Sequence, residues 1–106
     1  MLNLEPLIKI IGNDEKSLNS LINTFLKTTK EDIRNLESAV NNRQDKLVRE
    51  IAHRIKGGAA IIGAETLATL ADSMESSGLN RKVDQYDSTI QSIKSQFEAI
   101  ESLYGQ

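Results

Sequence analysis

His53 is the only histidine in this chain of 106 residues, and its surroundings suit a reaction with an anion. Successive residues are about 100° apart around a helix, so a helix with its apolar stripe between Ile51 and Ile55 turns His53 toward water, about 180° away. The same side of that helix carries cations and very small residues, namely Lys46, Arg49, Lys56, Gly57 and Ala60. We therefore expect an exposed imidazole ringed by cations and bordered by residues that let another surface approach.

Several chemistries that use a histidine are disfavoured by what the chain lacks. A metal site needs several ligands, and one histidine in a chain without cysteine does not supply them. A serine–histidine–carboxylate triad needs a pocket and an oxyanion hole, which a small helical chain does not obviously offer. Residues 57–63 are glycine-rich but lack the Gly-Lys-Ser/Thr ending of a phosphate-binding loop.

The remaining chemistry is that of the imidazole itself as a nucleophile. Neutral imidazole has a free nitrogen lone pair near pH 7, and its attack on a phosphoryl group gives a phosphohistidine. The dianionic product requires cations nearby, and Lys56 and Arg49 lie on the adjoining turns of the helix.

Gly57 and Gly58 form an unusual pair within the same segment. Glycine inside a helix costs about 1 kcal/mol relative to alanine, so the helix either ends at Gly57 or retains the pair for a reason. Because Ile62 continues the apolar stripe in phase and the next stop signal is Gly63, we expect a continuous helix. The glycines then indicate that another surface comes close to His53.

The elements that position these residues follow from a helical period along the whole chain. Helices are expected over 4–11, 15–40 with Asn13 or Asp14 as the cap, 44–62, 65–76 and 83–104, with a polar loop over 78–82. The short connections predict an all-α fold, an antiparallel up-down-up-down four-helix bundle with a short additional N-terminal helix over one end. The apolar stripes expected to fill its core are Leu18, Leu21, Ile22, Phe25, Thr29, Ile33, Leu36 and Val40; Leu47, Val48, Ile51, Ile55, Ala59 and Ile62; Leu67, Leu70, Ala71 and Met74; and Val83, Tyr86, Ile90, Ile93, Phe97, Ile100 and Tyr104.

Composition restricts the partners and the compartment. The 13 basic and 15 acidic residues give a net charge of −2, which disfavours binding to nucleic acid or to a membrane surface. No apolar run approaches the roughly 20 residues of a membrane span, and no secretory signal is visible at the start. We expect residues 1–106 to form a single domain, cytoplasmic and monomeric.

Residues 52–64, Ala-His-Arg-Ile-Lys-Gly-Gly-Ala-Ala-Ile-Ile-Gly-Ala, resemble the signature of histidine-containing phosphotransfer (HPt) domains. The family pattern has an apolar residue two positions after the histidine, Lys-Gly at three and four, small residues next, and Gly-Ala at ten and eleven. Each of these positions matches, and length and helix order agree over nearly the whole chain. Ile61 departs from the small polar residue of many members and bears on partner preference. The segment is most similar to the HPt modules that end bacterial hybrid sensor kinases.

The resemblance implies a phosphorelay intermediate in two-component signal transduction, without kinase activity of its own. His53 would accept a phosphoryl group from a receiver-domain aspartate of a hybrid sensor kinase and pass it to the receiver of a response regulator. Lys56 would be its electrostatic support, and Gly57 the gap that admits the receiver. The receiver would supply magnesium, so the domain itself would need no cofactor or metal. The resemblance also allows that the chain is the cytoplasmic end of a membrane-anchored sensor kinase.

Glu75 is expected to act on His53 across the turn at residues 63–64. Residues ten or eleven before such a turn face those ten or eleven after it, which places His53 level with Met74 and Glu75. Met74 lies on the apolar stripe, whereas Glu75 is about 80° from Leu67 and can lean toward the preceding helix. We expect its carboxylate to accept a hydrogen bond from His53 Nδ1–H, a part that Gln or Glu plays in HPt relatives. The alternative is a solvated charge near the end of a helix.

Two other classes of protein compete with this interpretation. The dimerisation domain of a histidine kinase also shows a histidine on a helix, but an acidic residue usually follows it and a proline comes soon after. Here Arg54 follows His53, and the chain's single proline is Pro6. The second alternative is a non-catalytic helical adaptor with an incidental histidine, which would take up no phosphoryl group.

Overall fold

The structure, a computed structural model, describes residues 2–105, and within that range every regular element is a helix. The prediction of an all-helical chain is therefore confirmed. The elements are α1 (Glu5–Ile11), α2 (Glu15–Asn41), α3 (Asp45–Ile61), α4 (Glu65–Leu79), the short 3-10 helix η1 (Val83–Gln85) and α5 (Tyr86–Tyr104). No helix in the described part of the chain is both long enough and apolar enough to cross a membrane.

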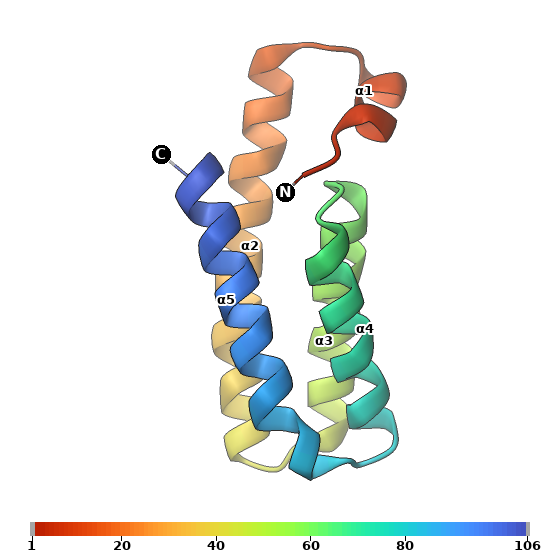
Figure 1. Ribbon diagram of the computed structural model, residues 1–106, viewed down its shortest axis with the longest axis vertical. Helices are drawn as coiled ribbons and strands as arrows, with labels where there is room; N and C mark the ends of the chain where they lie inside the picture. Colours follow the sequence, from red (N-terminus) through yellow and green to blue (C-terminus); the bar gives the residue numbers. More distant parts are fainter. Residues whose placement is uncertain (1, 106) are drawn as a thin grey trace.

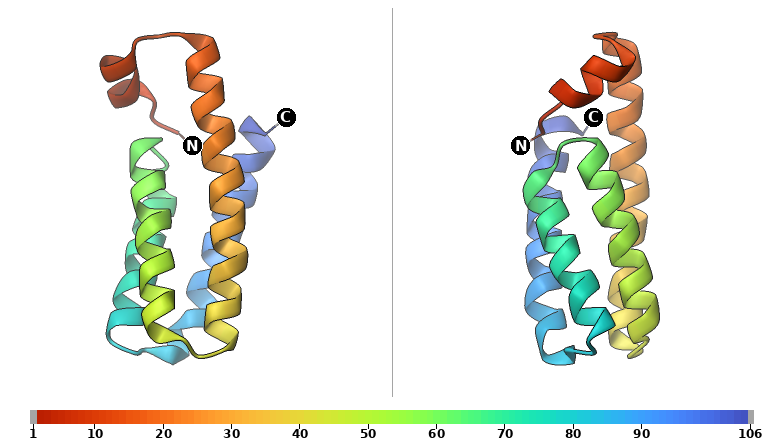
Figure 2. Two further views of the ribbon diagram at one scale, coloured as in Figure 1. Left: turned by 180° about the vertical axis from the view of Figure 1, so that it is seen from behind. Right: turned by 90° about the vertical axis from the view of Figure 1, so that its right-hand side faces the viewer.

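The four longer helices lie side by side around a common core (Figure 1). Helix α3 packs against α2 and α4, and α5 packs against α4 and α2. The chain reverses between α2 and α3 at one end of the bundle, between α3 and α4 nearer the other end, and again before α5 (Figures 1 and 2). The first turns of α2 extend beyond the ends of α3 and α4. This layout places α3 and α4 next to each other along their whole length.

The core is formed by the apolar stripes of the helices, because side chains three or four residues apart share one face. Fully buried members from each long helix include Leu36, Ile55, Met74 and Ile93. The predicted core was wrong for Leu21 and Leu47, which are exposed. Each lies at the margin of the buried stripe of its own helix.

The end of α4 differs from the expectation. The polar residues after Ser76 predicted a loop from residue 78, but α4 continues through Gly78 to Leu79. Gly78 is buried, and a Cβ atom there would lie 2.9 Å from the backbone nitrogen of Arg49 on α3. Glycine is therefore required at this position for the two helices to approach. The last long helix begins at Tyr86 after the 3-10 helix, three residues later than expected.

Helix α1 lies over the turn between α3 and α4 (Figure 2). The backbone N–H of Asn3 donates a hydrogen bond of 2.9 Å to the Gly63 carbonyl, and Leu7 is buried. Gly63 has φ +74°, and a side chain there would overlap the Asn3 backbone. The turn that brings α3 and α4 together thus depends on a glycine.

Candidate functional site

Helix α3 presents His53 to solvent. Its side chain is 67 % exposed, as expected for a residue opposite the buried positions Ile51 and Ile55. The helix runs through Gly57 and Gly58 without interruption, so the prediction of a continuous helix is confirmed. The glycine pair is therefore not a helix stop, and its cost in helix stability is present in the folded domain.

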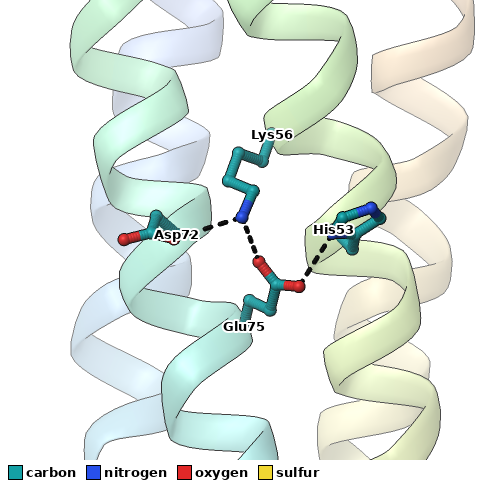
Figure 3. A network of polar contacts seen from close by, with 4 residues as sticks. All are labelled: His53, Lys56, Asp72 and Glu75. Carbon is teal, nitrogen blue, oxygen red and sulfur yellow. Dashed lines mark hydrogen bonds and ion pairs between the residues drawn. The ribbon is translucent and has the colours of Figure 1, made fainter.

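A cluster of four polar side chains surrounds the imidazole: His53 and Lys56 from α3, and Asp72 and Glu75 from α4 (Figure 3). His53 Nδ1 lies 2.8 Å from Glu75 Oε2. The other oxygen of the same carboxylate, Oε1, lies 2.6 Å from Lys56 Nζ. Lys56 Nζ also donates to Asp72 Oδ1 at 3.2 Å. We call these four residues the histidine cluster.

The charge of the Glu75 carboxyl group determines which of the two residues, His53 or Glu75, carries the proton of their hydrogen bond. The hydrogen bond from Lys56 lowers the pKa of Glu75, and the hydrogen bond with His53 acts in the same direction, against the effect of burial. Glu75 is therefore ionised at neutral pH, and a carboxylate only accepts hydrogen bonds. His53 Nδ1 must then carry the proton that is donated. In the neutral ring this leaves the lone pair on Nε2, on the side of the ring away from Glu75 (Figure 3).

The Lys56 ammonium lies between two carboxylates. Its pKa is raised chiefly by the hydrogen bond to Glu75 and next by the one to Asp72. Lys56 is thus charged and shared between the two α4 side chains. Its side chain is 32 % exposed, and it lies on the turn of α3 that follows His53.

The residues proposed from the sequence to contact a partner all lie exposed on α3. They are Lys46, Arg49, Gly57 and Ala60. A Cβ atom built on Gly57 would meet no heavy atom within 4 Å, so the surface there is open. A shallow groove beside the imidazole is lined by His53 and Arg49 together with Glu50, Leu79 and Glu75. The structure thus brings Arg49 to the same groove as the histidine.

Two acidic residues near the histidine were missed by the sequence analysis. Asp72 belongs to the histidine cluster, and counting outward from the turn at 63–64 places it level with Lys56, by the same argument that found Glu75. Asp32 on α2 is buried and accepts a hydrogen bond from Arg54, the residue after His53. In the sequence, the position of Asp32 beside Ile33 on the apolar stripe of α2 is the feature that could have indicated a buried carboxylate. This ion pair ties α3 to α2 next to the site.

Comparison with known proteins identifies the class to which this bundle belongs. The model of the Hpt domain family matches residues 20–103, which include the whole histidine cluster. The chain belongs to the Hpt domain family, so the resemblance found in residues 52–64 is confirmed. Hpt domains are phosphotransfer intermediates that interact with receiver domains in phosphorelays.

Among solved structures, the chain is similar to the crystal structure of histidine-containing phosphotransfer protein B from Pseudomonas aeruginosa PAO1. The two sequences are 25 % identical, the TM-score is 0.87, and the match covers 95 % of this chain and 85 % of that chain. A comparison with curated protein sequences gave no match. The family and this likeness support a phosphotransfer role in two-component signalling.

Proposed function

We propose that this domain is a phosphorelay intermediate in which His53 carries the phosphoryl group. It takes the group from the phosphorylated aspartate of one receiver domain and passes it to the aspartate of another. The observation that carries the proposal is the 2.8 Å contact between His53 Nδ1 and an ionised Glu75, on a ring that is otherwise exposed. It leaves Nε2 as the nitrogen with both the lone pair and the access to attack.

In the transfer step, the Nε2–P bond forms while the bond between phosphorus and the donor aspartate oxygen breaks. The electron pair of that bond returns to the donor carboxylate. The imidazole gains positive charge as Nε2 shares its lone pair, and the Glu75 carboxylate faces that charge. The second receiver reverses the step, and its aspartate oxygen takes the phosphoryl group from Nε2. Lys56 is the cation of the histidine cluster and supports the phosphoryl group electrostatically.

The receiver supplies the magnesium ion for this reaction. An in-line phosphoryl transfer is accelerated by positioning and by charge around the phosphoryl oxygens, and one partner can supply the metal. The domain then needs no metal or cofactor of its own and has no kinase activity. Lys46, Arg49, Gly57 and Ala60 form the partner-binding surface, where the open side of Gly57 admits the receiver loops.

The domain connects two other proteins of a two-component system. The donor is the receiver of a hybrid sensor kinase, and the acceptor is the receiver of a response regulator. Residues 1–106 act as a single monomeric domain, an antiparallel up-down-up-down bundle, in the cytoplasm. They work either alone or as the cytoplasmic end of a membrane-anchored sensor kinase, without binding nucleic acid or the membrane.

A transfer assay tests this function. The purified domain is incubated with receiver domains cloned from the same genome, each phosphorylated beforehand with a radioactive label. We expect at least one receiver to pass its label to the domain within minutes, in a form lost in acid and stable in base. A helical adaptor would take up no label from any of them, and that result would overturn the proposal.

Replacement of Glu75 by alanine tests how the imidazole is held. We expect phosphoryl transfer to slow by about ten-fold. For histidines that bind metals, loss of the hydrogen-bond partner of the ring lowers metal affinity or activity by about 10- to 100-fold, and we expect the lower end of that range here. Glu75→Gln keeps an oxygen that can accept the Nδ1–H hydrogen bond, so it serves as the matched control. The ¹⁵N chemical shifts of the single histidine should show a mixture of tautomers in Glu75→Ala and mainly the Nδ1–H tautomer in Glu75→Gln. Equal tautomer ratios in Glu75→Ala and the parent would contradict the assignment.

A further inference from the structure

Lys56 is in contact with two carboxylates of α4 at once. Its ammonium contacts Glu75 at 2.6 Å and Asp72 at 3.2 Å, and these two carboxylates lie one turn apart on α4. Glu75 divides its oxygens between Lys56 and His53, whereas Asp72 approaches from the other side of the lysine (Figure 3). Asp72 is 67 % exposed, so packing does not hold its side chain in this position.

We propose that Asp72 is a positioning residue that holds Lys56 back from the phosphoryl group on His53, and so keeps the phosphohistidine from becoming too stable to pass on. This inference rests on the proposed function and adds a control on the same site. An intermediate in a relay must release the group it accepts, and a cation fully committed to the phosphoryl oxygens would oppose that release.

Charge and position support this role for Asp72. The Lys56 ammonium has three N–H donors and two carboxylate partners in the cluster, so its third N–H remains for a phosphoryl dianion on Nε2. Asp72 lies on the side of Lys56 away from His53 (Figure 3), so its negative charge attracts the ammonium away from that phosphoryl group. Changing Asp72 to asparagine removes one negative charge and weakens one of the two holds on Lys56.

The second ionisation of the phosphoryl group reports how much positive charge reaches it, and a purely structural residue would not change it. Phosphoramidate phosphorylates the histidine without any receiver. The P–N bond of the reagent breaks, the Nε2–P bond forms, and ammonia leaves. The ³¹P chemical shift is then followed from pH 5.5 to pH 9, across the range where a phosphoryl group loses its second proton.

In Asp72→Asn we expect the midpoint of this titration to fall by about half a pH unit or more, which is about a three-fold change in the ionisation constant. Asp87→Asn is the matched control, because it makes the same charge change on an exposed residue at the start of α5 and should leave the midpoint unchanged. An unchanged midpoint in Asp72→Asn would overturn the proposal.

A second pair of variants tests whether Asp72 acts through Lys56. In a Lys56→Gln background, the Asp72→Asn change should move the midpoint by less than half as much as in the parent. An equal shift would show that Asp72 acts directly on the phosphoryl group, which would also overturn the proposal.

The interaction of Asp72 with Lys56 can be measured without phosphorylation of the domain. Because Asp72 raises the pKa of Lys56, Asp72→Asn should lower that pKa in an NMR titration of the lysine Nζ. No change there would count against the inference alone. The proposed function would fail separately if the parent domain took no phosphoryl group from receivers, even though Asp72→Asn lowered the pKa of Lys56.

Discussion

Replacement of His53 by glutamine is expected to abolish phosphoryl acceptance completely while the bundle stays folded. Glutamine has no nucleophilic nitrogen, but its amide can still donate a hydrogen bond to Glu75. The His53 side chain is 67 % exposed, so the free energy of unfolding should change by less than about 1 kcal/mol. The measurements are label transfer from a phosphorylated receiver and urea unfolding of the two proteins.

Two outcomes would contradict this account of His53. Label that persists in His53→Gln would place the acceptor elsewhere in the chain. Unfolding of the variant would show that the histidine holds the bundle together, which its exposure does not predict. Glu98→Gln, an exposed substitution on α5, is a matched control for the purification and the assay.

Replacement of Gly57 by glutamate is expected to lower transfer from a receiver by at least about 100-fold, because like charges placed face to face cost several kcal/mol in an interface. In the free domain the new side chain has room, since a Cβ on Gly57 meets no heavy atom within 4 Å. The variant should therefore fold normally, with an unchanged circular dichroism spectrum. Its effect arises only when a receiver approaches the surface beside His53.

Gly57→Ala separates the effect of the added bulk from the effect of the added charge. Alanine adds one methyl group and no charge, and it should stabilise α3 by up to about 1 kcal/mol. We expect transfer in Gly57→Ala to stay within a few-fold of the parent. Transfer at the parent rate in Gly57→Glu would mean that the receiver does not approach over this part of α3.

The sequence was sufficient for much of the site because the chemistry lies on regular helices. A period of 3.6 residues determined that His53 is exposed and that Lys56 lies on the next turn. Counting residues from the turn at Gly63 brought Glu75 next to the imidazole, where the structure places it at 2.8 Å. These inferences needed only the pitch of a helix and the position of one turn.

What the sequence did not reveal depends on contacts between helices. Gly78 was assigned to a loop because its neighbours are polar, but the close approach of α4 to the Arg49 backbone keeps it inside a helix. The buried Asp32 was missed because a lone acidic residue on an apolar stripe shows no partner until α3 supplies Arg54.

The central claim is that phosphorus is carried on Nε2 of His53, and NMR of the phosphorylated domain tests it most directly. The domain is labelled with ¹⁵N in its one histidine, phosphorylated by a receiver, and measured by long-range ¹H–¹⁵N correlation with detection of the ³¹P coupling. The account predicts that the coupling falls on Nε2 and that Nδ1 carries the proton. Coupling on Nδ1, or a labelled domain whose histidine shows no phosphorus at all, would contradict it.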